Sequence, residues 1–227
     1  AYRRQRQMCI RDRGGTNTPR HIDGMLEVLQ GDKEDKPKLV HRLDKDTSGV
    51  LLIARTGKAA KALTESFRIR KTNKIYWALV KGKPSQVEGS IQAPLDKEPG
   101  TRGERMAVSD NGRRAITDFR VMDSAAGTVT WMAFRPITGR THQIRVHATV
   151  LCTPIIGDGK YAAREAFIDG PISKKLHLHA RSIEIDHPDG GLLSVKAPLP
   201  LHMLESWGLF GFNDEDNSDP FEEVDNV

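Results

Sequence analysis

The chain carries, at residues 41–54, the stretch HRLDKDTSGVLLIA, in which a polar segment leads directly into a continuous apolar run. The apolar part, residues 50–54, has the length and composition of a short buried strand. In the polar part, Asp46 and Ser48 are residue types that satisfy backbone groups in turns, and Gly49 accepts an unusual dihedral. Taken alone, such a segment is more often a charged turn than an active site, so the rest of the chain decides its meaning.

Further elements are predicted on both sides of this stretch. Helical spacing of apolar residues predicts helices at 18–29, 58–69 and 141–151. Alternating or aromatic-rich segments predict strands at 75–80, 115–122, 128–134, 176–185 and 192–195, the second and third forming a hairpin. Because these strands do not alternate regularly with helices, we expect an α+β fold, with one domain built on a mostly antiparallel mixed sheet with flanking helices and loops. The polar residues 94–114 are expected to form a long, irregular functional loop.

Charge is unevenly distributed along the 227 residues. The whole chain has 35 Lys and Arg against 30 Asp and Glu, but residues 213–227 contain seven acids and no base. Without this tail, 35 basic residues oppose 23 acidic ones, which is a net charge of +12. Such a charge fits a polyanionic partner, RNA or DNA alike, and equally a surface whose charges only maintain solubility. We expect the acidic tail, 213–227, to be disordered.

The first thirteen residues differ from the rest. The segment AYRRQRQMCIRDR holds five arginines and lacks the apolar region of a signal peptide. We interpret residues 1–13 as a non-native segment, with a basic RNA-binding arm as the alternative, and residues 14–212 as the folded domain. No run of about 18 apolar residues exists, so no membrane span is predicted. The two cysteines, Cys9 and Cys152, give no disulfide framework and fit a reducing cytoplasm. We expect the protein to be a monomer.

Several common site motifs are absent. The sequence contains no glycine-rich phosphate loop ending in Gly-Lys-Ser/Thr, no Gly-x-Gly-x-x-Gly and no His-Glu-x-x-His. His177 and His179 share one face of a predicted strand, but no cysteine or acid at a recognisable spacing completes a metal site. We therefore predict chemistry that needs no cofactor and no metal, or no chemistry at all.

Other blocks accompany the opening stretch in a fixed order. Lys74-Ile-Tyr-Trp-Ala78 precedes RPITGRTHQIRVHA at 135–148, and then come IIGD at 155–158, Tyr161 and LHA at 178–180. Together with HRLDKDTSG, these blocks closely resemble the hallmarks of the RluA-type family of RNA pseudouridine synthases, and the resemblance covers nearly the whole body of the chain.

The resemblance implies isomerisation of uridine to pseudouridine in RNA, with Asp44 as the catalytic carboxylate. This reaction breaks the C1′–N1 bond, turns the uracil and joins C1′ to C5. It is neutral in redox and atoms, which agrees with the missing cofactor motifs. Asp44 either attacks C1′ and holds the sugar covalently, or removes the C2′ proton to give a glycal. Both routes require an ionised carboxylate.

The remaining roles also come from the resemblance. Arg145 corresponds to the family arginine that pairs with the catalytic aspartate, which would keep it ionised. Tyr76 corresponds to the tyrosine that stacks on the target uracil, and Arg42 to an arginine that fills the space left by the flipped nucleotide. Apolar walls are expected from Ile144 and Leu178, and RNA or structural contacts from Arg140 and His142. Candidates for either an RNA track or solvated surface charge are Arg70, Lys71, Lys74, Lys81 and Lys83.

The chain also departs from the ribosomal members of this family. An S4-like RNA-binding domain and a strand ending in Asn-Lys-Pro-x-Gly are expected before residue 14 and are missing, so we expect a domain truncated at its amino terminus. The favoured substrate is 23S ribosomal RNA, and transfer RNA is the nearest rival. A catalytically idle RNA-binding protein and a nucleoside hydrolase are rival interpretations of the whole chain. The hydrolase would need a second placed carboxylate, and Asp46 lies poorly for that role, two residues from Asp44.

Overall fold

The structure, a computed structural model, describes residues 22–30, 34–100 and 103–222. The segment interpreted as non-native, residues 1–13, and the last five residues of the acidic tail lie outside the described residues. Among those described, no helix is both long and apolar enough to cross a membrane.

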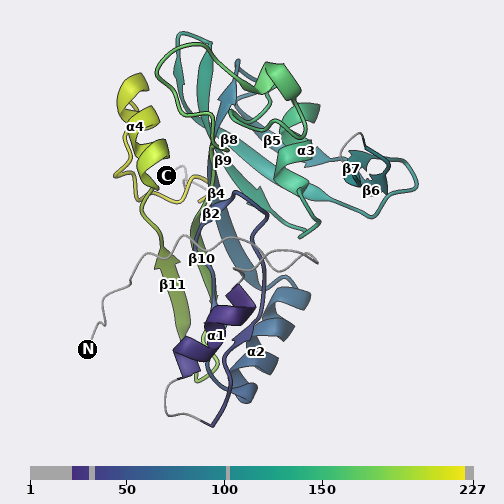
Figure 1. Cartoon of the computed structure of the whole chain (residues 1–227), viewed down its shortest axis with the longest axis vertical. Helices are drawn as coiled ribbons and strands as arrows, with labels where there is room; N and C mark the ends of the chain where they lie inside the picture. The colour runs from purple at the N-terminus through teal and green to yellow at the C-terminus, as the bar shows by residue number, and fades with distance from the viewer. Residues whose placement is uncertain (1–21, 31–33, 101–102, 223–227) are drawn as a thin grey trace, which may run out of the picture.

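One seven-stranded sheet runs along the molecule (Figure 1). Its order is β11 (Leu192–Lys196), β10 (Leu178–Asp186), β4 (Thr72–Lys81), β9 (Val129–Pro136), β8 (Ile116–Ala125) and β5 (Glu88–Gln92), with β2 (Ser48–Gly49) also beside β10. Every pairing along this path is antiparallel, whereas β2 pairs with β10 in parallel. The expected α+β domain on a mostly antiparallel mixed sheet is confirmed.

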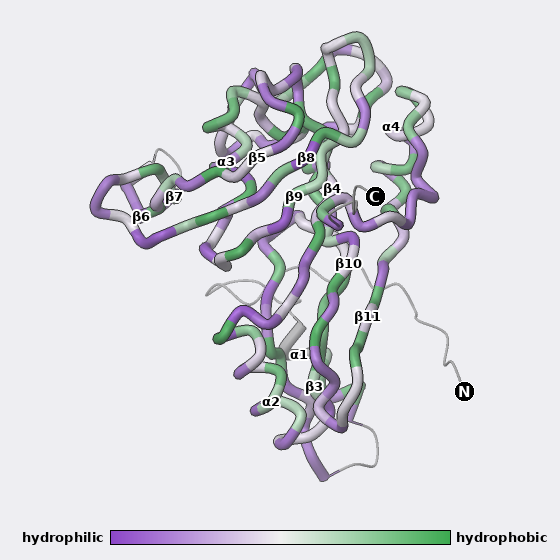
Figure 2. The backbone as a smooth tube through the Cα atoms, turned by 180° about the vertical axis from the view of Figure 1, so that it is seen from behind, coloured by the Kyte–Doolittle hydropathy of each residue, from purple (hydrophilic) through white to green (hydrophobic). Residues whose placement is uncertain are grey.

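The sheet is apolar on both faces, and a helix covers each. Successive side chains of a strand point to opposite faces, so Trp77 and Leu79 of β4 join one core and Ala78 and Val80 the other. The helix α4 (Leu201–Phe210) packs on the first face and α3 (Gln143–Val150) on the second. Figure 1 shows these two helices on opposite sides of the strands, and Figure 2 shows green and purple positions alternating along β10.

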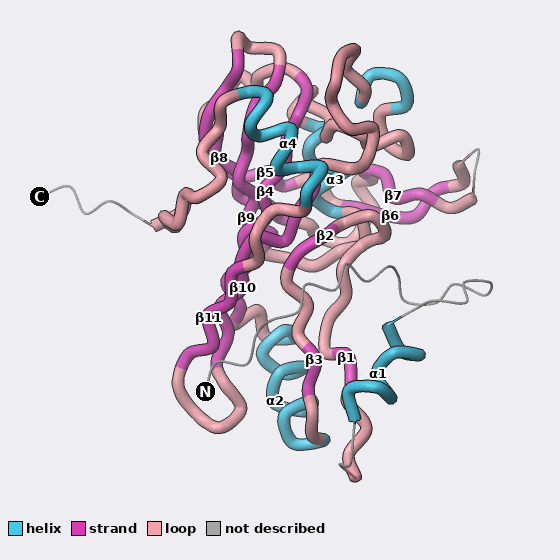
Figure 3. Tube along the Cα trace, turned by 60° about the vertical axis from the view of Figure 1, so that its left-hand side comes forward, coloured by secondary structure: helices cyan, strands magenta, loops and turns pink. Residues whose placement is uncertain are grey.

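The opposite end of the molecule carries the early elements. The helices α1 (Ile22–Gln30) and α2 (Gly57–Arg68) lie there beside a small sheet of β1 (Lys38–Leu39) and β3 (Ile53–Ala54), as Figure 3 shows. The helix α2 starts where Thr56 caps it, because the Thr56 hydroxyl accepts a hydrogen bond from the Ala59 N–H at 3.1 Å. A short 3₁₀ helix, η1 (Ala163–Ala166), follows α3.

Two predicted segments differ from the structure. Residues 50–54 do not form one strand, because the chain leaves β10 after β2 and joins β1 through β3, a separate two-stranded sheet. Residues 94–114 are not wholly irregular either. They contain the hairpin of β6 (Leu95–Glu98) and β7 (Arg105–Val108), which projects from the body in Figure 1. Most side chains of this hairpin lie outside the core, so its sequence lacks the alternation of apolar and polar residues that predicts a strand.

The described part of the acidic tail, residues 213–222, lies against the body of the protein, and the disorder expected for residues 213–227 stays a prediction. Arg181 of β10 donates hydrogen bonds to the backbone carbonyls of Asp214 and Asp216, at 3.3 and 3.2 Å. Phe221 packs against the core on the α4 face, with the Arg135 guanidinium 4.6 Å above its ring. Backbone carbonyls and one aromatic ring hold this segment in place, and neither contribution is visible in a count of its charges.

Candidate active site

A cavity of about 410 Å³ opens on the α3 face of the sheet. This volume lies in the usual range for small-molecule sites in proteins. The structure brings six of the eight predicted site residues to its walls, namely Arg42, Asp44, Tyr76, Arg140, Ile144 and Leu178. The other two are not part of the lining: His142, just before α3, donates its backbone N–H to Asp44, and Arg145, in α3, pairs with Asp158.

Asp44 lies on a turn that is attached to the sheet by its backbone. The turn closes where the Thr47 N–H donates to the Asp44 carbonyl at 3.0 Å, with Asp46 in the left-handed region at φ 67°. Gly49 then runs so close to β10 that an added Cβ would lie 2.2 Å from the carbonyl oxygen of Ala180. Its φ of 120° is one that only glycine adopts easily. The opening stretch is therefore both a turn and a cavity wall.

Two histidines fix the ends of this loop. The ring of His41 accepts the Leu52 N–H at 2.8 Å and stacks on Phe67 of α2. His179 of β10 donates from Nε2 to the Ala197 carbonyl at 3.1 Å, so its Nδ1 accepts the Ser48 hydroxyl proton at 2.8 Å. Burial lowers the pKa of His179 to about 4, which keeps its ring neutral for this role.

No metal site is formed by His177 and His179. The ring nitrogens of His179 are engaged by Ser48 and a backbone carbonyl, and His177 contacts the Lys175 carbonyl and the Ser206 hydroxyl. In the part of the chain that the structure describes, no group of three or more His, Cys, Asp or Glu side chains is arranged to hold a metal ion.

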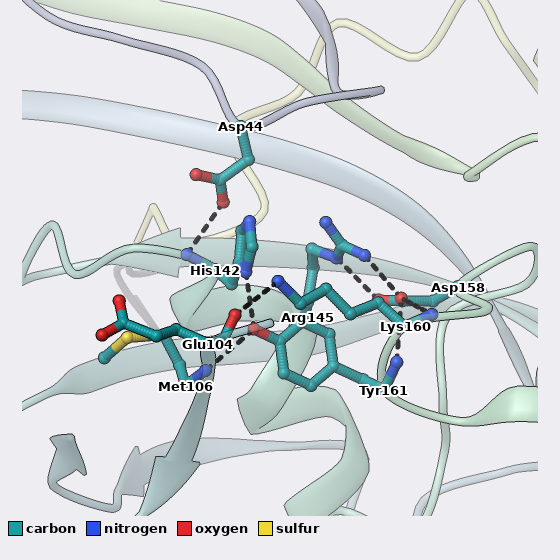
Figure 4. Close-up of polar contacts among 8 residues, drawn as sticks. All are labelled: Asp44, Glu104, Met106, His142, Arg145, Asp158, Lys160 and Tyr161. Atoms are coloured by element: carbon teal, nitrogen blue, oxygen red, sulfur yellow. Dashed lines mark hydrogen bonds and ion pairs between the residues drawn. The ribbon is translucent and has the colours of Figure 1, made fainter. Parts of the chain in front are cut away.

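The carboxylate of Asp44 is oriented by the start of α3. Its Oδ2 accepts a hydrogen bond from the backbone N–H of His142, at 3.0 Å (Figure 4). His142 is the residue that precedes the helix, and its φ of 53° is left-handed. The amino-terminal end of a helix carries a partial positive charge that favours an anion by about 0.3–1 kcal/mol. The geometry therefore favours the ionised form of the carboxylate that both chemical routes need.

Gln143, which the sequence pattern does not single out, holds the approach to this helix. Its Oε1 accepts hydrogen bonds from the Thr138 hydroxyl at 2.6 Å and the Arg140 N–H at 3.0 Å. Its Nε2 donates to the Ile116 carbonyl and to the Thr117 hydroxyl, both at 2.8 Å. The only signal in the sequence is an amide side chain at the first turn of a helix predicted to be half apolar.

Arg145 differs in part from the expectation that it pairs with Asp44. Its Nε and Nη2 donate to the two carboxylate oxygens of Asp158, at 2.8 and 2.6 Å, in a bidentate ion pair (Figure 4). Both side chains are buried, with relative exposures of 7% for Arg145 and 1% for Asp158. Burial lowers the pKa of Arg145, whereas the hydrogen bonds and negative charge of Asp158 raise it and the charge of Asp44 raises it further. The net result is a pKa above the ordinary value. Asp158 belongs to the IIGD block, yet only the fold shows its partner.

Tyr76 points from β4 into the same cavity. Burial raises the pKa of its phenol well above the ordinary value, and the negative charge of Asp44 raises it further. The phenol therefore stays neutral beside Asp44. A ring of this kind in a cavity wall suits stacking on a planar partner.

The remaining walls combine apolar and cationic groups. Ile144 and Leu178 are buried apolar residues that line the cavity, and Arg42 is exposed. Arg140 donates from Nε to the Arg114 carbonyl at 3.1 Å. Of the five cations suggested for an RNA track, Arg70 and Lys74 line the cavity, and burial lowers the pKa of Lys74. Lys81 instead donates to the Phe167 carbonyl.

A family model described as RNA pseudouridylate synthase matches residues 10–149. The chain belongs to this family. The dual-specificity RNA pseudouridine synthase RluA of Escherichia coli is 38% identical over 78% of this chain and 80% of its own length. The ribosomal large subunit pseudouridine synthase C of Rickettsia conorii is also 38% identical, over 83% of this chain. The resemblance seen in the sequence blocks is thereby confirmed.

Other relatives are longer than this chain. The mitochondrial RNA pseudouridine synthase 4 of Arabidopsis thaliana is 37% identical over 86% of this chain, which spans 55% of that relative's length. The chain likewise spans 62% of the Rickettsia conorii protein. Among solved structures, human RNA pseudouridylate synthase domain containing 4 superposes with a TM-score of 0.70 at 27% identity, covering 86% of this chain and 85% of that one.

Proposed function

We propose that this protein isomerises uridine to pseudouridine in RNA, with Asp44 as the group that attacks the sugar or removes its C2′ proton. The observation that carries the proposal is the Asp44 carboxylate at the wall of the cavity, held by the start of α3 beside the neutral phenol of Tyr76. A carboxylate fixed in this way can act as nucleophile or base without a cofactor.

The surroundings of Asp44 fit a flipped uridine. The ring of Tyr76 offers a stacking surface, and Ile144 and Leu178 offer apolar walls. Arg42 is exposed at the cavity wall, where it can fill the place that the nucleotide leaves in the RNA. Extruding a base costs a few kcal/mol, which contacts of this kind can offset.

We favour large-subunit ribosomal RNA as the substrate. The support comes from relatives from two Rickettsia species whose names state a ribosomal large subunit activity. Transfer RNA is the alternative within the same activity, and a catalytically idle RNA-binding protein is the alternative outside it. The monomeric state and the cytoplasmic location stay predictions, and one relative's name places that relative in mitochondria.

The test uses ribosomal RNA and transfer RNA that lack pseudouridine. After incubation with the protein, carbodiimide-dependent reverse-transcription stops map each new pseudouridine. We expect stops with the wild type that vanish with Asp44→Asn, which removes the charge and keeps the shape. Asp46→Asn is the matched control, because Asp46 is exposed two residues away and asparagine tolerates its left-handed backbone.

Each contrary outcome decides against the proposal in its own way. RNA binding without stops would favour the idle binder, and release of free uracil would favour a hydrolase. Stops that persist in Asp44→Asn would remove Asp44 from the chemistry. Stops confined to transfer RNA would keep the activity and replace the substrate.

A further inference from the structure

A series of polar contacts connects the projecting hairpin to Asp44 through the hydroxyl of Tyr161 and then the ring and the backbone N–H of His142 (Figure 4). The hydroxyl of Tyr161 accepts the N–H of Met106, in β7, at 3.2 Å and meets Nδ1 of His142 at 2.5 Å. Either side chain can supply the shared proton, because the phenol oxygen can also accept from Nδ1, and the contact joins the two side chains in both cases.

The state of the His142 ring agrees with this arrangement. Burial lowers the pKa of His142 to about 4, and the positive charges of Arg145 and Lys160 contribute to the lowering. The ring is therefore neutral, and its Nδ1 can donate or accept. In Figure 4 the other ring nitrogen is turned away from Tyr161, toward the side on which Asp44 lies.

Holding this ring also holds the peptide that orients Asp44. The N–H that Asp44 accepts belongs to His142 itself, and no side chain caps α3 at this position. The left-handed φ of 53° is uncommon for a residue other than glycine, so the surroundings must maintain it. The contact with Tyr161 is the one described hydrogen bond of the His142 side chain, and it fixes the ring relative to the backbone.

Other contacts hold the backbone and the ring of Tyr161. Its N–H donates to Oδ1 of Asp158 at 3.2 Å, and its ring lies 5.0 Å from the guanidinium carbon of Arg145. Next to it, the Lys160 ammonium donates to the Glu104 carbonyl of the hairpin segment at 3.0 Å. Because these contacts do not involve the hydroxyl, we expect the ring to keep its place when the hydroxyl is removed.

We propose that the hydroxyl of Tyr161 is a positioning group for the reaction, acting through His142 to fix the Asp44 carboxylate for attack on the sugar. This inference rests on the proposed function, and Tyr161 itself touches no reacting atom. A misplacement of about 1 Å in a reacting group can lower a rate about 100-fold. We therefore expect Tyr161→Phe to slow the chemical step by roughly 10- to 100-fold, with RNA affinity changed less than about twofold.

The test measures single-turnover rates and RNA dissociation constants in a double-mutant cycle. Tyr161→Phe keeps the ring beneath Arg145, and His142→Asn removes the imidazole while tolerating the left-handed backbone. We expect each single variant to be slow and the double variant to be no slower than His142→Asn. Thr149→Val is the matched control, because it removes another hydroxyl associated with α3, one that donates to the Val146 carbonyl.

Wild-type rates in Tyr161→Phe would overturn the inference. An equal loss in both backgrounds would also overturn it, because the hydroxyl would then not act through His142. If Tyr161→Phe fails to fold, the rate of His142→Asn relative to the control decides. If the wild type forms no pseudouridine, the proposed function fails, and amide hydrogen exchange then tests the positioning role of Tyr161. Tyr161→Phe must speed exchange of the His142 N–H, and an unchanged exchange rate would contradict that role.

Discussion

Replacing Gly49 by alanine tests how tightly the Asp44 loop is joined to the sheet. The new Cβ would lie 2.2 Å from the Ala180 carbonyl oxygen and 2.6 Å from its nitrogen, so the two backbones must separate. Separation weakens the hydrogen bond from the Val50 N–H to the same carbonyl, now 2.9 Å long. The φ of 120° also strains any residue that has a Cβ.

The expected loss follows from these contributions. Backbone strain costs about 1–3 kcal/mol, and one weakened hydrogen bond about 1 kcal/mol. Forced separation of packed backbones adds roughly 1–3 kcal/mol, and the stiffer unfolded chain returns about 0.4–1 kcal/mol. We therefore expect Gly49→Ala to lower the free energy of unfolding by about 2–7 kcal/mol. Because Asp44 lies on the same loop, the reaction should slow as well.

The assay is urea unfolding followed by tryptophan fluorescence. All three tryptophans, Trp77, Trp131 and Trp207, lie in the core on the α4 face and report global unfolding. Gly127→Ala is the matched control, since its φ of 68° is also positive but no heavy atom lies within 4 Å of the added Cβ. That variant should lose about 1–2 kcal/mol. A loss in Gly49→Ala no larger than in the control would refute the close approach as the reason for glycine.

Two further outcomes concern the buried polar groups. Asp158→Ala should lower the free energy of unfolding by about 3–5 kcal/mol, because it leaves the buried Arg145 charge without its partner. In the same urea assay, the double variant Arg145→Met/Asp158→Leu should recover part of this loss. A loss in the double variant equal to or greater than that of Asp158→Ala would contradict the explanation. Acid should destabilise the fold through His177 and His179, whose pKa values of about 4 lie below the ordinary 6.5. The unfolded chain therefore binds protons first, so this stability is complete above about pH 6.5 and is lost as the pH falls toward 4, by up to roughly 3 kcal/mol per histidine. NMR titration of the two rings checks this, and midpoints near 6.5 would contradict it.

The sequence predicts the strands well where packing follows a simple period. The segment 75–80 is rich in aromatic and branched residues because β4 is buried on both faces. The segment 176–185 also forms a strand, although the polar residues of its alternation, His177, His179 and Arg181, are themselves buried. The predicted hairpin of 115–122 and 128–134 is β8 and β9. The helix α4 is not predicted. Its N-cap residue, Pro200, offers no capping side chain, and exposed leucines, Leu201, Leu204 and Leu209, obscure the helical spacing of its buried residues.

The candidate site is only partly visible in the sequence. The blocks identify Asp44, Tyr76 and Arg145, because their residue types and order are characteristic of the family. They do not show that Arg145 forms its ion pair with Asp158, or that the backbone N–H of His142 orients Asp44. Such partners depend on which segments meet across the fold, and local pattern does not carry that information.

The short parallel pairing of β2 with β10 has a consequence for how the protein assembles. The hydrogen bond from Ser48 to His179 spans 131 residues of sequence, and the one from His142 to Asp44 spans 98. Closing such long loops is entropically unfavourable until the intervening strands have formed their own contacts. We therefore expect the Asp44 loop to take its place late in folding, after β4, β9 and β10 have come together. A chain leaving the ribosome would then place the Asp44 carboxylate at the cavity only once its sheet is nearly complete.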